Sequence, residues 1–324
     1  MKYLVLLFAI FLVQSTVLFA QEKRQVTFED GKVLDYSFYF DKPYDIYDWS
    51  ISASLGILTL EENFLALILK PYYEINEKLF FDSKIAISLA GGSPNISYEP
   101  LAKPYFEFFP EIHYELFNKG KQKQANLWLE SNKESIDVTL SYNTKLDYVQ
   151  RQSIYLDGGL DIGSMTGERV VRDDPTGDLV LISQRYAALS IGISRRASNN
   201  YKVSVSRGGA RYFSKTGQLS IKALFGSPLS PGLATNKITT VNGLPNSELV
   251  LNPTDYSELN KRNIGVRVSF DREKSFARKP NIFLTWGIGL GLNPAFLSDN
   301  STFADSEGVY SSMRIGLGFG KLTL

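Results

Sequence analysis

The chain has 324 residues, of which 44% are hydrophobic, 13% aromatic and 21% charged, a composition too apolar and too aromatic for a disordered chain. It has no cysteine and one histidine, which excludes a disulfide framework, a thiol nucleophile, a lipoprotein anchor and a metal centre built from cysteines or several histidines. The net charge of +1 gives no reason to expect a nucleic-acid partner.

Residues 1–20 have the pattern of a secretory signal peptide. A short basic start is followed by an apolar run from Leu4 to Val13, and small and apolar residues lead up to Ala20. The run has about ten residues, whereas a membrane-spanning helix needs about twenty. We therefore predict export with cleavage after Ala20. Residues 21–48 then form an N-terminal periplasmic or plug segment, and residues 49–324 form the main domain.

After residue 48, apolar and polar residues alternate with period two along most of the chain. From Tyr105 to Leu116, one face carries mostly aromatic and aliphatic residues, and the other carries carboxylates and a histidine. Similar runs occur near 49–60, 64–75, 79–90, 134–143, 150–163, 179–194, 201–209, 217–226, 261–272, 280–292 and 309–322, with a weaker one near 125–131. Many are longer than the five or six residues of a typical soluble strand, and about ten residues of tilted strand cross a bilayer.

The connections differ in length. Some are short and polar, as at 61–63, 76–78, 119–123 and 131–133, whereas 91–102, 164–178, 227–260 and 293–308 are long. Short turns on one side and long loops on the other are typical of an antiparallel transmembrane β-barrel. If long loops follow only odd-numbered strands, one more strand is needed within 237–252, which gives fourteen strands. Twelve is the alternative, if the run at 125–131 or some hairpins lie outside the membrane.

A soluble β-sandwich or propeller is the competing interpretation. Its strands should be shorter, and its exposed faces should be mostly charged or rich in threonine. Here the apolar face is nearly continuous, and no convincing amphipathic helix follows residue 20. The pattern favours the all-β transmembrane barrel.

With its signal peptide, its alternating strands and its final strand from Ser311 to Gly320, the chain resembles outer-membrane β-barrel proteins of Gram-negative bacteria. The resemblance covers residues 49–324, and the aromatic-rich style is similar to barrels of the Bacteroidota. It implies a location in the outer membrane, contact with outer-membrane lipid and insertion by the barrel-assembly machinery. The chain ends on Leu324, whereas many members of this family end on an aromatic residue.

The polar faces of the strands should line the barrel interior. On one strand they present four titratable side chains, and other strands offer cations to oppose them. The candidates for a lumen constriction are Glu107, Glu111, His113, Glu115, Arg151, Lys202, Lys222 and Arg267. They form either a constriction that selects solutes or a set of salt bridges that fills a closed barrel.

Three strands that become neighbours on barrel closure present only small residues inward. These are Ser50, Ser52, Ser54, Gly56, Gly287, Gly289, Gly291, Gly316, Gly318 and Gly320. Repeated strand glycines mark close backbone approach or strong curvature. The small-residue wall is therefore either a docking surface for an internal segment, such as residues 21–48 or 227–260, or a device for curvature at the seam.

Three hypotheses for function follow. The first is a channel or transporter for small solutes, and the second is a non-enzymatic structural or accessory barrel of a secretion, motility or adhesion complex with a protein partner. The third is a lipid-modifying enzyme acting through His113, which the absence of a nearby serine in sequence disfavours. We expect no enzyme activity, no cofactor, no metal and no nucleic-acid partner.

Overall fold

A computed structural model describes residues 21–39, 47–60, 62–91, 105–133, 139–172, 178–205, 209–229, 232–241, 244–251, 260–297 and 308–322. The predicted signal peptide, residues 1–20, lies outside the described residues.

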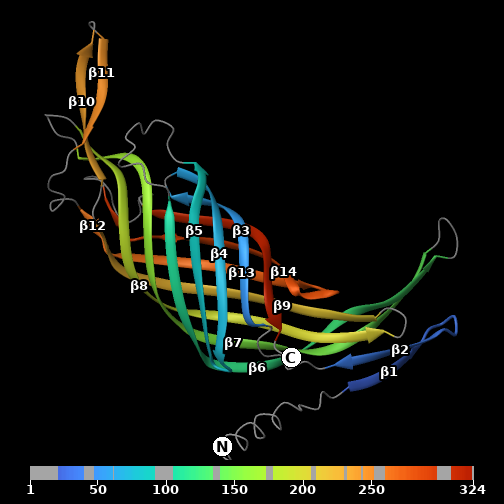
Figure 1. Ribbon diagram of the computed structural model, residues 1–324. Helices are drawn as coiled ribbons and strands as arrows, with labels where there is room; N and C mark the ends of the chain where they lie inside the picture. The colour runs from blue at the N-terminus through green and yellow to red at the C-terminus, as the bar shows by residue number, and fades with distance from the viewer. Residues whose placement is uncertain are drawn as a thin grey trace, which may run out of the picture.

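The chain forms a closed antiparallel β-barrel of ten strands (Figure 1). In barrel order these are β3 (Tyr47–Leu60), β4 (Glu62–Asn76), β5 (Leu79–Gly91), β6 (Phe106–Lys133), β7 (Thr139–Arg172), β8 (Asp178–Val205), β9 (Gly209–Pro228), β13 (Ile264–Phe276), β14 (Lys279–Leu292) and β16 (Val309–Leu322). Closure occurs where β16 pairs with β3, with Gly318 opposite Ser52. The all-β antiparallel barrel predicted from the alternation is therefore confirmed.

The predicted count of fourteen barrel strands is not confirmed, because several predicted strands are segments of longer ones. The runs at 105–116 and 125–131 both fall in β6. The described parts of the runs at 134–143 and 150–163, from residue 139 on, both fall in β7, and residues 179–194 and 201–205 both fall in β8. The polar stretch at 119–123 is not a turn but a continuation of β6, with each residue paired to β7. The predicted long loop at 164–178 is mostly strand, since β7 runs to Arg172. With ten strands, the three remaining long connections, after β5, β9 and β14, follow odd-numbered barrel strands, so the parity rule needs no additional strand.

The two ends of the barrel differ in character. One end, which we call the loop end, carries the long connections after β5, β9 and β14 and the five-residue connection after β7. The strand expected within 237–252 is instead a hairpin of β10 (Gly232–Val241) and β11 (Leu244–Leu251), which projects from this end (Figure 1). The short strands β12 (Lys261–Arg262) and β15 (Ala295–Phe296) pair with each other. The other end, the terminal end, is where β3 begins and β16 finishes.

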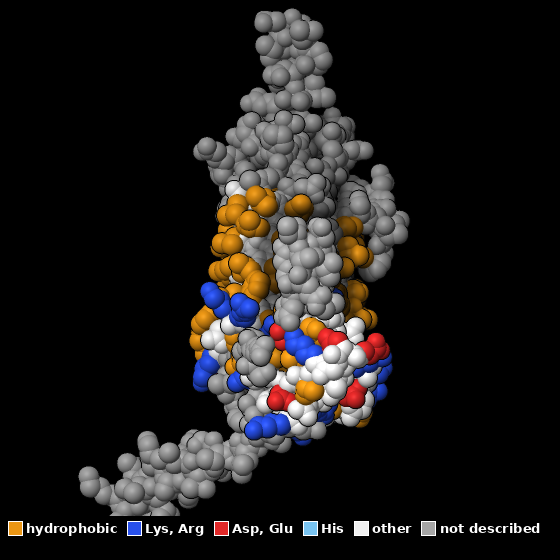
Figure 2. Space-filling model, turned by 90° about the vertical axis from the view of Figure 1, so that its right-hand side faces the viewer, with side chains coloured by type: hydrophobic (Ala, Val, Ile, Leu, Met, Phe, Trp, Pro, Cys, Tyr) orange, Lys and Arg blue, Asp and Glu red, His pale blue; other side chains and the backbone are white. Residues whose placement is uncertain are grey.

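The outward face of the barrel is apolar on all ten strands. Large exposed hydrophobic side chains alternate with inward residues, and examples from successive strands are Leu55, Leu65, Leu89, Ile112, Leu156, Ile191, Ile221, Val266, Ile288 and Ile315. Figure 2 shows hydrophobic side chains along the flanks and charged side chains gathered at one end. A monomer in water rarely exposes so continuous an apolar surface. Within the described residues, no helix has the length and hydrophobicity to cross a membrane.

At the terminal end, β6 to β9 continue beyond the barrel and form a second, smaller structure, which we call the extension. β1 (Gln21–Thr27) and β2 (Val33–Tyr39) form a hairpin, and β2 adds to the edge of β8. The turn between them contains Gly31 at φ 76°, a conformation that favours glycine. The described part of the predicted N-terminal segment therefore lies beside the extension rather than inside the barrel (Figure 1).

The extension has its own hydrophobic core. Its buried members are Leu34, Tyr36, Phe38, Leu127, Leu129, Tyr142, Leu146, Tyr201, Val203 and Val205. The tip of the β1–β2 hairpin is attached to β6 and β7, since Tyr142 donates a 2.6 Å hydrogen bond to Asp30 and Lys32 lies 3.3 Å from Glu130. The hydrogen bond from Tyr142 also lowers the pKa of the Asp30 carboxyl.

Deleting residues 21–39 while keeping the predicted signal peptide should leave the barrel closed and expose the extension. The deletion removes three buried members of its core, Leu34, Tyr36 and Phe38, but no residue of the barrel interior. We expect heat-modifiable migration on gels as in the wild type, with faster trypsin cleavage within 117–150. A conducting pore in the deletion variant would contradict this expectation, because it would mean that residues 21–39 lie in the lumen of the membrane-inserted protein.

Candidate functional site

The barrel interior is filled by side chains in three layers. At the loop end, an apolar and aromatic layer contains Leu58, Phe64, Ala66, Ile68, Ala86, Tyr105, Tyr186 and Tyr310, all buried. The middle layer consists of charged side chains. At the terminal end, Tyr47 and Phe283 pack together with ring centroids 4.9 Å apart. Because successive side chains of a strand point to opposite sides, the residues that fill each layer alternate along each strand with the outward-facing ones.

The most extensive group of contacts in the middle layer is centred on Arg267 of β13. Its guanidinium lies 2.5 Å from Glu107 of β6 and 2.8 Å from Asp161 of β7. It also donates hydrogen bonds to the Tyr186 hydroxyl at 2.9 Å and to the Asn293 side chain. β6 and β13 are the fourth and eighth strands of a ten-stranded barrel, so this contact crosses the lumen.

Four of the other predicted lumen residues also form ion pairs. Glu111 is paired with Lys222 of β9, and Glu115 lies 2.5 Å from Arg151 of β7. All four are buried. Lys202 does not join them, because it lies where β8 runs alongside β2 in the extension. The prediction that Lys202 lines the lumen is therefore wrong, since β8 has already left the barrel at that point.

His113 is fully buried between two carboxylates. Its Nδ1 lies 2.8 Å from Asp157 and its Nε2 lies 3.3 Å from Asp82. Its ring stacks on Phe80 with centroids 4.2 Å apart. Ser194 donates its hydrogen bond to Asp157, at 2.9 Å, and not to the imidazole. In this arrangement the aspartate lies between the serine and the histidine, so the histidine has no serine hydroxyl beside it to activate as a nucleophile.

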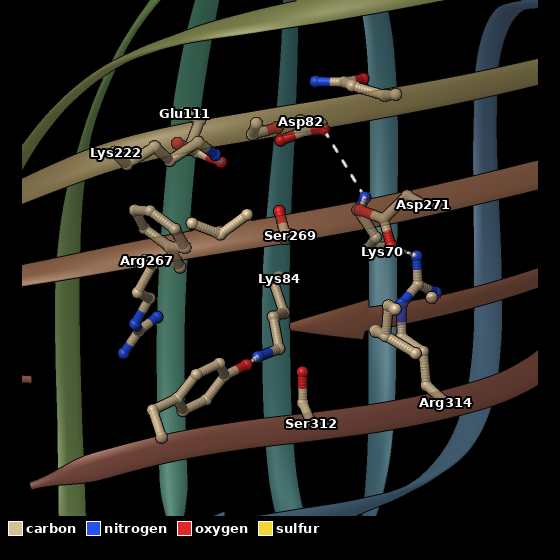
Figure 3. Close-up of a pocket in the computed structure, with 17 residues that line it drawn as sticks. Lys70, Asp82, Lys84, Glu111, Lys222, Arg267, Ser269, Asp271, Ser312 and Arg314 are labelled. Atoms are coloured by element: carbon tan, nitrogen blue, oxygen red, sulfur yellow. Dashed lines mark hydrogen bonds and ion pairs between the residues drawn. The ribbon is translucent and has the colours of Figure 1, made fainter. Parts of the chain in front are cut away.

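A second ion-pair chain lies toward the barrel seam. Lys70 of β4 lies 3.0 Å from Asp271 of β13, and Arg314 of β16 lies 2.7 Å from the same carboxylate. Figure 3 shows these side chains converging on the interior together with Lys84, whose ammonium lies 2.6 Å from Glu107. The cavity that remains between them measures about 70 Å³, and a neighbouring one about 30 Å³. Such volumes hold a few water molecules at about 30 Å³ each.

Asp82, Glu111 and His113 could together hold a metal ion, since one ligand atom from each lies within 4.8 Å of the others. Two cations already occupy the same carboxylates: Lys222 pairs with Glu111, and Lys70 lies 3.9 Å from Asp82. A divalent ion would have to displace or repel these ammonium groups. The cations therefore favour the ion-pair network over a metal centre.

The small-residue wall is brought together as predicted, because β14, β16 and β3 are neighbours. The space above its glycines is already occupied by side chains or backbone of adjacent strands. A Cβ at Gly318 would lie 2.1 Å from the Phe283 ring, and one at Gly287 would lie 2.1 Å from the Asp271 carboxylate. Among the described residues, neither 21–39 nor 232–251 lies against this wall. The glycines allow close side-chain packing across the seam.

Sequence reasoning missed several members of the network. Those are Lys70, Asp82, Lys84, Asp157, Asp161, Asp271 and Arg314, with the tyrosine hydroxyls of Tyr105, Tyr186 and Tyr310. A signal was present, since Asp82 and Lys84 share one face of a short, otherwise apolar strand. Which acid meets which base depends on barrel curvature and strand register, which alternation within single strands does not contain.

Comparisons with known proteins give little further information. No family model matches the chain, and no curated protein matches it in sequence. Among solved structures, it is similar to OmpT, an outer membrane protein of Vibrio cholerae, at 9% identity and a TM-score of 0.18, covering 88% of this chain and 97% of that one. A superposition with so low a score carries no argument, so the resemblance to barrels of the Bacteroidota stays a prediction.

Proposed function

We propose that the chain is an outer-membrane β-barrel of the structural or accessory kind, closed to solutes and presenting its extension to the periplasm. The location is supported by the apolar outward face on all ten strands, which suits the hydrocarbon of a bilayer. Outer-membrane barrels keep their short turns on the periplasmic side. The long connections after β5, β9 and β14 lie at the loop end, whereas the turns 77–78 and 277–278 lie at the terminal end, so in this proposal the terminal end faces the periplasm.

The observation that carries the closed-barrel proposal is the set of ion pairs that spans the lumen. Arg267 joins Glu107 across the barrel, Lys222 joins Glu111, and Asp271 joins Lys70. Polar lumens of open porins hold water between their charged walls. Here opposite walls contact each other directly, and an aromatic layer lies above them at the loop end.

A closed barrel predicts electrical silence. Purified full-length protein, inserted into planar bilayers, should give no discrete conductance steps, and proteoliposomes should not swell in small sugars. Heat-modifiable migration and flotation with the vesicles serve as the controls for folding and insertion. Discrete, reproducible steps from inserted wild-type protein would overturn the proposal in favour of the solute channel.

The charged lumen is the one observation that favours the channel as a second candidate. A channel would need the pairs Glu107–Arg267 and Glu111–Lys222 to separate during gating. A double variant, Glu111→Gln with Lys222→Gln, removes one pair without leaving a lone charge. Under the closed-barrel proposal it stays silent, because the Arg267 contacts and the aromatic layer remain. Conductance in this variant alone would point to a gated pore.

A further inference from the structure

A large cavity lies outside the barrel wall, between the wall and the extension. Its volume is about 630 Å³. Tyr148 and Tyr201 of the extension line one side, and Phe276 and Leu284 of the barrel rim line the other. Ligand sites of a few hundred cubic ångströms are commonly apolar and aromatic with a few polar groups.

The alternation of inward and outward residues along β9 and β13 shows that this cavity lies on the outer side of the barrel, next to the outward apolar surface. On β9, Lys215 is in phase with the outward residues Leu219 and Ile221. On β13, Lys274 is in phase with Val266 and Val268, which are also outward. The cavity therefore begins where the apolar band stops, at the depth at which lipid headgroups meet a barrel.

Three ammonium groups converge on this cavity without a carboxylate. Lys123, Lys215 and Lys274 all line it, and no acidic residue does. Lys215 and Lys274 stand directly opposite each other on paired strands, which is unfavourable for like charges. Arg272, Lys274 and Lys123 all repel the charge of Lys215. Within the described part of the chain, none of these three lysines has an ion-pair partner.

We propose that this cavity binds the phosphate headgroup of a phospholipid from the periplasmic leaflet. The lysines supply the charge that a phosphate needs, and the aromatic walls and adjacent apolar band accommodate glycerol and acyl chain. The inference rests on the proposed membrane location and orientation of the barrel. It goes further by naming a ligand class and the residues that hold it.

The test is lipid binding by the full-length protein in a neutral detergent, read by native mass spectrometry. The probes are dioctanoyl phosphatidylglycerol and, separately, inorganic phosphate. Wild-type protein should retain the lipid, and Lys215→Gln with Lys274→Gln should weaken retention by about ten-fold or more. The matched control is Lys119→Gln with Lys121→Gln, two exposed lysines of β6 outside the cavity, which should retain the lipid as the wild type does.

Each outcome has a distinct meaning. Equal retention by wild type and by the Lys215/Lys274 variant would overturn the site, as would equal loss in the control variant. Binding of inorganic phosphate as tight as that of the lipid would show a site for a free anion and would overturn the lipid assignment. Failure of the wild type to float with vesicles would instead contradict the proposed membrane location, whatever the lipid result.

Discussion

Replacing Arg267 with methionine should cost about 3–5 kcal/mol of the free energy of unfolding, the range found when one partner of a buried ion pair is removed. The guanidinium contacts Glu107 at 2.5 Å and Asp161 at 2.8 Å, and all three side chains are almost fully buried. Methionine fills a similar volume but leaves two carboxylates without their shared cation. Because total stability of a domain is about 5–15 kcal/mol, this loss should be visible as a large shift of the urea midpoint in refolding from detergent or lipid vesicles.

Two further variants separate charge from packing. In Arg267→Met, Glu107 keeps its ion pair with Lys84, whereas Asp161 loses its cation. Adding Asp161→Asn removes that carboxylate's charge and should recover part of the loss. The control is Arg195→Gln, since Arg195 is exposed and its side chain donates a 3.1 Å hydrogen bond to Gln152, so the variant should change stability by about 0.5 kcal/mol or less. A wild-type urea midpoint for Arg267→Met would mean that the lumen is hydrated and that its ion pairs do not hold the barrel together.

Strand alternation predicted which side chains face inward but not how many strands the barrel has. From Glu107 to Glu115, every inward residue named from sequence is buried in the lumen. The error in strand number arose where strands continue beyond the barrel. Between 118 and 124, β6 is exposed and polar, and a stretch of this kind has the same sequence pattern as a turn. The alternation of apolar and polar residues therefore indicates the surroundings of a strand but not where the strand ends.

For the candidate site, the sequence predicted the inward-facing charges of a single strand but not their ion-pair partners on other strands. The acidic face of β6 was found because its charges alternate with aromatics, whereas Asp157 and Asp161 of β7 were missed. Their partners lie on strands far apart in sequence, as with Asp161 and Arg267. That pairing follows from the closure of ten strands, because a wider barrel would hold the same walls apart. Strand number therefore decides whether these charges line a channel or neutralise one another.

The seam glycines give the second prediction of large effect. Gly318 of β16 lies directly opposite Phe283 of β14, and a Cβ at this position would lie 2.1 Å from the phenyl ring. Gly318→Val should therefore cost about 1–3 kcal/mol or more from overpacking, despite the higher strand propensity of valine. It should also lower the fraction that reaches the heat-modifiable form, because β14, β16 and β3 form the seam that closes the barrel.

A size exchange tests whether packing is the cause. Phe283→Ala combined with Gly318→Val makes room for the new side chain and should recover folding yield relative to Gly318→Val alone. The matched control is Gly158→Val, since Gly158 lies exposed on β7 and a Cβ there meets nothing within 4 Å. It should fold as the wild type does or better. If Gly318→Val and Gly158→Val had equal yields, the wall would be open space, as a docking surface for an internal segment requires, rather than one face of a packed seam.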